Sequence, residues 1–141
     1  MIKIGKEYRW EMSHRLQFYD GLCKNIHGHS YKMIIELEGE IDKNGIVLDF
    51  FKIDEIVKPI LNEYDHCFAI NSNDNEIRDF LINNNFKIVD QDFNSTSENL
   101  SRHFANLLKD KFAEFSNLYF LTVRIYETID AYAEIKINLQ N

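Results

Sequence analysis

The sequence has few of the residues that mark secreted, membrane or disordered proteins. Its 141 residues include two cysteines, five glycines and one proline, and no apolar run approaches the roughly 18 residues of a membrane-spanning helix. Two cysteines make no disulfide framework, and there is no Gly/Ser linker or internal repeat to divide the chain. The first residues lack the charged start and apolar core of a signal peptide. We therefore expect a single domain over residues 1–141, in the cytoplasm and without a membrane partner.

Positive charge is also scarce. The net charge is -7, and no run of basic residues occurs. This balance argues against nucleic acid as the main partner, although a few local Lys or Arg side chains can still hold a small anionic substrate. The hydrophobic content of 45% is sufficient for one sizeable core.

Alternating apolar and polar residues predict two strands in the first third of the chain. Residues 8–18 place His14 on the apolar side of the alternation, and residues 27–39 do the same with His27 and His29. We expect the two segments to pair as a hairpin. All three imidazoles would then lie on one face of one sheet.

The middle of the chain predicts helices, and the end predicts further strands. Apolar residues at helical spacing indicate a helix over residues 50–64, which the single proline, Pro59, is expected to kink or restart. Ser95 and Glu98 fit a capping box at the start of a second long helix. The expected fold class is α+β, with an antiparallel four-stranded sheet and helices on one face. The other expected elements are a short helix within residues 71–85, a short strand at 87–90, and strands over 119–127 and 131–139.

The three histidines predict a metal site. An imidazole on an apolar face needs a partner. His27 and His29 are two residues apart in a strand and so project together, while His14 lies on the strand expected to pair with theirs. Three histidine ligands with an open fourth position are the arrangement of a catalytic zinc ion, Zn2+.

The sequence gives weaker evidence of a function for four other residues when each is taken alone. Cys23 is either a fourth ligand, which would close a structural zinc site, or a base that stands beside the metal. Asp65 and His66 form an adjacent carboxylate and imidazole after a helix, and Glu127 ends an apolar strand face. Solvated residues are common at such places, so these three need support from elsewhere.

Six short segments, taken together and in their order along the chain, resemble motifs of the 6-pyruvoyltetrahydropterin synthase and 6-carboxytetrahydropterin synthase family. The resemblance runs almost from end to end. It implies the tunnelling fold (T-fold), in which a small antiparallel sheet with helices on its outer face assembles into a barrel, usually as a homohexamer of two trimers. The segments are SHRL (13–16), CKNIHGHSY (23–31), GIVLDFFKI (45–53), DHCFAIN (65–71), STSENL (95–100) and YETIDAY (126–132).

The resemblance also implies roles for individual residues. The three histidines would bind zinc, and a neighbouring subunit would supply the Asp-His pair of a proton-transfer triad. The guanidine-like edge of a pterin ring offers parallel N–H donors that suit a carboxylate. The implied metal ligands are His14, His27 and His29, the catalytic triad is Cys23, Asp65 and His66, the pterin anchor is Glu127, and the pocket residues are Thr96, Ser97 and Glu98.

Within the family, the three-residue spacer between Cys23 and His27 favours the bacterial-type 6-carboxytetrahydropterin synthase. That lyase converts 7,8-dihydroneopterin triphosphate to 6-carboxy-5,6,7,8-tetrahydropterin, acetaldehyde and triphosphate on the route to queuosine. Ser95 stands where bacterial members often have proline, which keeps the 6-pyruvoyltetrahydropterin synthase branch as an alternative. Two further hypotheses are a non-catalytic domain with a closed structural zinc site, and a T-fold protein that binds a purine or pterin for a different reaction.

Overall fold

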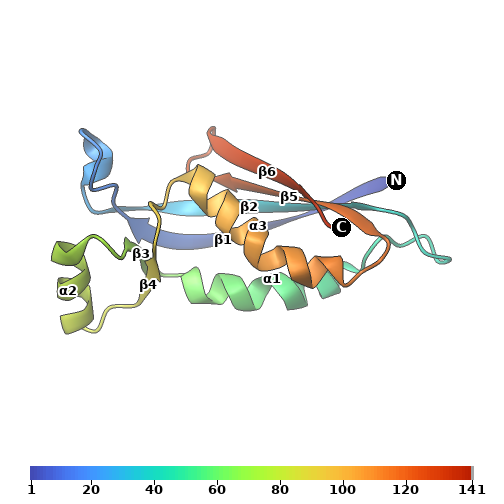
Figure 1. The fold of residues 1–141 in the computed structure, drawn as a ribbon, viewed down its shortest axis with the longest axis horizontal. Helices are drawn as coiled ribbons and strands as arrows, with labels where there is room; N and C mark the ends of the chain where they lie inside the picture. Colours follow the sequence, from blue (N-terminus) through green and yellow to red (C-terminus); the bar gives the residue numbers. More distant parts are fainter. Residues whose placement is uncertain (141) are drawn as a thin grey trace.

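Residues 1–140, which the computed structural model describes, form a six-stranded sheet accompanied by three α-helices (Figure 1). No helix in this range combines the length and apolar character needed to cross a membrane. The strands are β1 (Ile2–His14), β2 (His27–Gly39), β3 (Cys67–Asn71), β4 (Ile88–Gln91), β5 (Leu118–Tyr126) and β6 (Tyr132–Asn138). The helices are α1 (Phe50–Tyr64), α2 (Asn75–Asn83) and α3 (Ser97–Ala113), with a 3-10 turn, η1, at Leu22–Lys24. The strand order across the sheet is β4-β3-β1-β2-β5-β6.

The pairing of β1 with β2 sets the position of the histidines. The two strands run antiparallel in an unbroken register that ends with His14 opposite His27, and His29 lies opposite Met12. Residues directly opposite each other in an antiparallel pair point to the same face. That face therefore carries all three imidazoles at one end of the hairpin, and the predicted pairing is confirmed.

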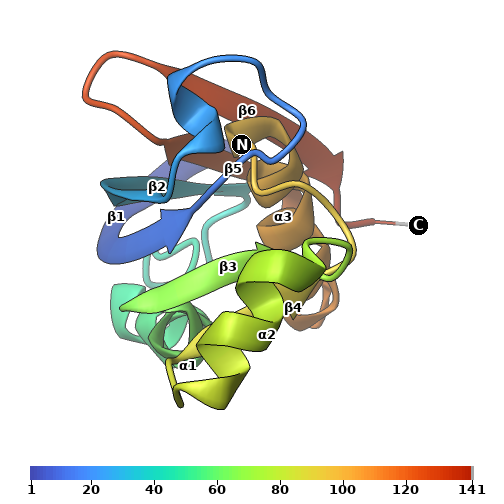
Figure 2. The same cartoon turned by 90° about the vertical axis from the view of Figure 1, so that its left-hand side faces the viewer.

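Helices α1 and α3 lie on one face of the sheet, and the main hydrophobic core lies between them and the strands (Figures 1 and 2). α3 contacts β5 and β6, whereas α1 contacts β1 and β3. In the centre, Trp10 of β1 stacks on Tyr31 of β2 with ring centroids 5.1 Å apart. The ring of Phe104 from α3 meets Trp10 edge-on at 5.7 Å. The prediction of an α+β fold with helices against one face is confirmed for these two helices.

The sheet differs from the predicted one in size and in direction. It has six strands within residues 1–140 rather than four. It is mixed, because β3 runs parallel to β1 and β4 runs parallel to β3. Four of the five residues of β3 are buried, so this strand shows no alternation in its sequence. Cys67 and Ala69 enter the main core, whereas Phe68 and Ile70 pack in a second cluster beside α2.

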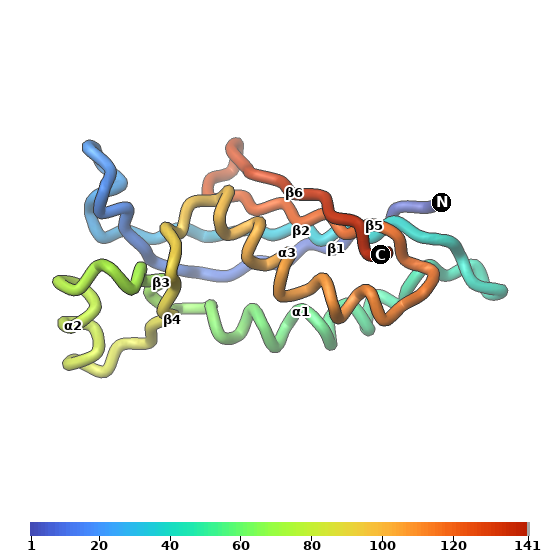
Figure 3. The backbone as a smooth tube through the Cα atoms, in the orientation of Figure 1, coloured from blue at the N-terminus to red at the C-terminus, as the bar shows by residue number. Residues whose placement is uncertain are grey.

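The predicted end of the first strand is also wrong. β1 ends at His14 instead of continuing to residue 18, and Phe18 is 61% exposed. Directly after β1, the Arg15 guanidinium binds both carboxylate oxygens of buried Asp74, each at 2.5 Å. This ion pair holds the residues after β1 next to the start of α2, so the chain leaves the sheet at this point. Helix α1 has the predicted bounds and contains Pro59 without a restart, and it runs as one continuous helix in Figure 3.

Replacing Phe104 by alanine should destabilise the protein strongly. The Phe104 side chain is fully buried against Trp10 and Tyr64, so its truncation should lower the free energy of unfolding by about 3–5 kcal/mol. Urea unfolding of wild type and Phe104→Ala measures the change. Phe51→Ala is the control, because Phe51 is 77% exposed and its loss should cost less than about 1 kcal/mol. Equal losses in the two variants would contradict the assignment of the core.

A histidine in α3 should make stability depend on pH. His103 is half-buried, and burial lowers its pKa below the ordinary value of 6.5. Its Nε2 atom lies 2.5 Å from the Tyr64 hydroxyl and accepts its hydrogen bond while unprotonated. The unfolded chain therefore binds a proton more readily than the folded one, and stability should fall as the pH drops below 6.5. His103→Gln should lose less stability than wild type between pH 7 and pH 5 in urea unfolding. Identical losses would assign the pH dependence to other groups.

Candidate functional site

Three imidazoles meet at the end of the β1–β2 hairpin, on the face covered by the helices. His14, His27 and His29 each offer one nitrogen, and these donor atoms all lie within 4.8 Å of one another. The Nε2 atoms of His14 and His27 are 3.1 Å apart. His14 is buried, with 1% of its surface exposed, while His27 and His29 are half-buried. The three residues predicted as ligands are thus brought together and could hold a metal ion.

Backbone carbonyls orient two of the imidazoles. The Nδ1 atom of His14 lies 2.9 Å from the carbonyl oxygen of Ser95, and that of His27 lies 2.7 Å from the carbonyl oxygen of Asn25. A carbonyl only accepts, so each Nδ1 carries the proton and each Nε2 presents a lone pair. Two lone pairs that face each other at 3.1 Å repel unless a cation lies between them. The Nε2 atom of His29 is buried without a hydrogen-bond partner. A cation with nitrogen ligands satisfies all three atoms.

The charge state of the cluster also suits metal binding. Burial lowers the pKa of His14 to about 4, with a further contribution from neighbouring His27, and the hydrogen bond to Ser95 opposes this shift. Burial also lowers the pKa of His29. Both imidazoles are therefore neutral at pH 7, which is the form that binds a metal ion.

Ser95 has a place in this site that the sequence did not indicate. It is buried, and both its carbonyl oxygen and its hydroxyl oxygen lie within 3.1 Å of Nδ1 of His14. The predicted capping box is wrong, because the N-cap of α3 is Thr96, whose hydroxyl accepts from the backbone N–H of Asn99. No local pattern relates Ser95 to a ligand 81 residues away; only the packing of α3 against the hairpin brings them together.

The four predicted pterin-pocket residues line a single cavity of about 260 Å3 next to the histidines. Thr96, Ser97 and Glu98 come from the start of α3, and Glu127 directly follows β5. The Glu127 carboxylate also reaches the cluster, with Oε1 3.4 Å from Nε2 of His14 and 3.7 Å from Nε2 of His29. Glu127 therefore connects this cavity with the histidine cluster. The other lining residues are Leu16, Ala131 and Tyr132.

Asp65 and His66 form a pair that is held by the backbone of β1. Oδ1 of Asp65 lies 2.9 Å from Nδ1 of His66 and accepts from the N–H of Glu11 at 3.0 Å. The N–H of His66 in turn donates to the carbonyl of Glu11. The hydrogen bond from Glu11 is the main reason that the pKa of Asp65 lies below its usual value. The pair leaves Nε2 of His66 directed away from Asp65 and able to exchange a proton with a ligand.

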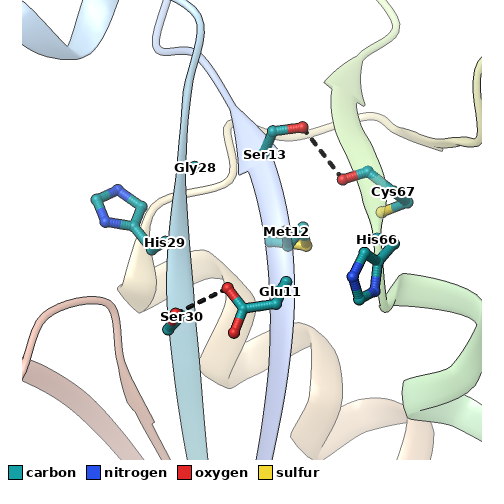
Figure 4. A pocket seen from close by; sticks show the side chains of 8 residues that line it. All are labelled: Glu11, Met12, Ser13, Gly28, His29, Ser30, His66 and Cys67. Atoms are coloured by element: carbon teal, nitrogen blue, oxygen red, sulfur yellow. Dashed lines mark hydrogen bonds between the residues drawn. The ribbon is translucent and has the colours of Figure 1, made fainter.

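The His66 backbone has a conformation that is uncommon for a residue with a side chain. Its φ angle is +60°, in the left-handed region, and such strain is concentrated at functional sites. The side chain is 74% exposed and lines a cavity of about 390 Å3, shown in Figure 4. Glu11 and Ser30 line the same cavity, and the Ser30 hydroxyl donates to the Glu11 carboxylate. His66 is not among the residues that line the cavity of Glu127.

Cys23 lies in η1, in the loop between β1 and β2, and is half-buried with a free thiol. Its sulfur does not belong to the group of mutually close donor atoms found within residues 1–140. This arrangement favours an open site with three histidines over a closed site in which Cys23 is a fourth ligand.

A profile of the family described as 6-pyruvoyl tetrahydropterin synthase matches residues 3–138. The chain belongs to this family. A relative from Haemophilus influenzae named 6-carboxy-5,6,7,8-tetrahydropterin synthase is 34% identical over 95% of this chain and 98% of its own length. A relative from Pyrococcus horikoshii, named as a putative synthase of the same kind, is 33% identical over 98% of this chain and 92% of its own length. The expectation of an enzyme of the carboxytetrahydropterin synthase type is confirmed by these relatives and by the family.

Two solved structures share the fold. The 6-pyruvoyl tetrahydropterin synthase of Plasmodium vivax superposes with a TM-score of 0.78 at 19% identity, over 97% of this chain and 98% of that one. An uncharacterized protein of Wolinella succinogenes gives a TM-score of 0.83 at 20% identity, over 95% of this chain and 97% of that one. At this level of identity the similarity concerns the fold alone, and it confirms the expected resemblance to T-fold structures.

Removing a single cluster histidine should abolish tight metal binding. Wild type should bind one Zn2+ per chain and melt at a higher temperature with the metal than after chelation, because a ligand that binds only the folded state stabilises it. His27→Ala should weaken zinc binding by at least about 100-fold, measured by competition with a chromophoric chelator. His103→Ala is the matched control, because His103 lies outside the donor group and its loss should leave the affinity unchanged. Equal affinities for wild type and His27→Ala would remove His27 from the site.

Proposed function

We propose that this protein is a zinc-dependent 6-carboxytetrahydropterin synthase. It would convert 7,8-dihydroneopterin triphosphate to 6-carboxy-5,6,7,8-tetrahydropterin, acetaldehyde and triphosphate, a step toward the deazapurine of queuosine. The observation that carries the proposal is the contact between an open three-histidine donor set and a cavity that contains a carboxylate, Glu127. The relatives named as carboxytetrahydropterin synthases support the choice of reaction.

The family implies zinc, and the donor set fits it. Three neutral imidazoles, two of them oriented by backbone carbonyls, match the ligands of catalytic zinc. His14, His27 and His29 would hold the ion, which when bound acts as a Lewis acid toward the hydroxyl groups of the substrate side chain and so acidifies the neighbouring C–H bond.

The cavity next to the cluster would hold the pterin ring. Glu127 would accept two parallel N–H groups from the guanidine-like edge of the ring. Thr96 and Ser97 offer hydroxyl groups, and the start of α3 gives the pocket a rigid wall.

Proton transfer would be shared between Cys23 and His66. The Cys23 thiolate would remove the carbon-bound proton of the substrate side chain. His66, oriented by Asp65 through the 2.9 Å contact at Nδ1, would exchange protons at Nε2 during the rearrangement. This role is consistent with the strained backbone of His66, whose φ of +60° places the residue in a conformation that is concentrated at functional sites.

The active site would be completed by a second copy of the chain. The cavity of His66 and the cavity of Glu127 have different lining residues. β6 is an edge strand of the sheet, and pairing of such edges closes sheets into barrels. We infer a homohexamer of two trimers, in which the Asp65–His66 pair of one subunit serves the metal cluster of its neighbour. Light scattering on the purified protein tests the subunit number.

Product analysis tests the reaction. Zinc-loaded wild type incubated with 7,8-dihydroneopterin triphosphate should yield the carboxy product and acetaldehyde, identified by mass spectrometry. Cys23→Ser should retain zinc and folding but lose turnover by about 10²–10⁴-fold. A pyruvoyl product would move the protein to the 6-pyruvoyltetrahydropterin synthase branch. Zinc loss in Cys23→Ser, together with an inactive wild type, would instead favour the non-catalytic domain with a structural site.

Mixing two inactive variants tests the shared site. Cys23→Ser and His66→Ala should each be inactive alone. Co-refolded as mixed oligomers, they should recover up to about a quarter of the wild-type turnover per chain, because one site in four then combines an intact Cys23 with an intact His66 from its neighbour. No recovery in oligomers that are shown to be mixed would place both residues in the site of a single chain.

A further inference from the structure

Glu127 approaches the metal cluster more closely than a residue dedicated to the pterin ring requires. Its Oε1 atom is 3.4 Å from Nε2 of His14 and 3.7 Å from Nε2 of His29. Four ligands at zinc-typical bond lengths of about 2.0–2.2 Å in a tetrahedron are separated by about 3.3–3.6 Å. The Glu127 oxygen therefore stands at almost the spacing expected of a further ligand to the same ion.

The Tyr31 hydroxyl also faces the Glu127 carboxylate, but a hydrogen bond from Tyr31 does not account for the contacts of Glu127 with two imidazoles. The proton of His14 is on Nδ1, where it is bound to Ser95, so Nε2 presents a lone pair toward the Glu127 carboxylate. Two acceptors face each other with no proton between them. Nε2 of His29 is likewise without a hydrogen-bond partner, although a carboxylate oxygen lies 3.7 Å away. A cation between these atoms converts each repulsive contact into an attractive one.

The position of Glu127 in the fold allows its carboxylate to move. The residue directly follows β5, at the start of the turn to β6, and its side chain is 28% exposed. It does not belong to the group in which all donors lie within 4.8 Å, so full coordination requires the carboxylate to shift toward His27. By contrast, the three imidazoles are on paired strands, and two of them are also tied to backbone carbonyls.

We propose that Glu127 is a fourth metal ligand in the pterin-free protein and that an arriving pterin ring draws its carboxylate away from the metal. This inference rests on the proposed zinc site and pterin pocket. The ring N–H groups and the metal compete for one carboxylate, so pterin binding frees a coordination position at the moment when the substrate hydroxyl groups arrive. The open position would then exist only in the presence of the correct ring, which links recognition of the ring to the chemistry at its side chain.

Cobalt substitution tests the proposal without any measurement of turnover. The visible absorption of Co2+ depends on the number and kind of its ligands, and Co2+ takes the same donor set as Zn2+. The spectrum of the full-length Co2+ protein should change in Glu127→Gln, and zinc affinity should fall at least about tenfold in the same variant. Glu98→Gln is the matched control, because Glu98 lines the same cavity and should leave the spectrum and affinity at wild-type values.

The pterin-dependent step is tested with neopterin as the probe. Neopterin added to the wild-type Co2+ protein should shift its spectrum away from that of the pterin-free form, and Glu127→Gln should show a much smaller change. An unchanged spectrum and affinity in Glu127→Gln would overturn the assignment of a fourth ligand. A wild-type spectrum that neopterin leaves unaltered at saturation, with binding verified by fluorescence, would overturn the displacement. Failure of the wild type to bind either metal would overturn the proposed metal centre itself, a result distinct from the other two.

Discussion

The register between β1 and β2 is the constraint on which the rest of the structure depends. Side chains alternate between the two faces of a strand, so a slip of one residue would send the imidazoles of β2 to the face opposite His14. The observed register places His14 directly opposite His27 and holds His29 on the same face. Below them on that face, Trp10 stacks on Tyr31, and both are buried. The large energetic cost of exposing this aromatic pair maintains the register that brings the three imidazoles together.

The placement of polar groups at the end of an apolar face explains the other features of the site. Buried imidazoles are costly unless they are hydrogen-bonded. The structure meets this need with carbonyl groups from the chain itself, Ser95 for His14 and Asn25 for His27. These partners also select the tautomer, because each accepts the Nδ1 proton and leaves Nε2 for a ligand. Stability and the orientation of the donor nitrogens therefore rely on the same hydrogen bonds.

The groups proposed to act on the substrate lie in two places on the hairpin. The helix-covered face carries the histidine cluster with Glu127 beside it. Residues of β1, β2 and the start of β3 line the cavity of His66, and His29 of the cluster is among them together with Glu11 and Ser30. In Figure 4 the His66 ring and the His29 ring lie on either side of the two strands. In the proposed function, the Asp65–His66 pair of a second subunit would complete the site that contains Glu127, whose cavity His66 of the same chain does not line.

Several features of the site followed from local patterns. The alternation in residues 27–39 placed His27 and His29 on one face, and the helix spacing of residues 50–64 located α1. The sequence did not predict β3, because a strand that is buried on both faces has no alternation of apolar and polar residues. The end of β1 was misplaced because the alternation continues past His14, while an ion pair between Arg15 and Asp74, distant in sequence, takes the chain away from the sheet.

By itself, the sequence determined which groups are available for chemistry, because strand parity and motif order depend on neighbouring residues. It yielded the three histidines as candidate ligands and, through the resemblance, the candidate residues of the pocket. Only the tertiary structure decided that Ser95 orients His14 and that Glu127 reaches the cluster. Both contacts join segments that meet only when α3 and β5 pack against the hairpin. Their geometry comes from close packing over the whole core, and no local pattern encodes it.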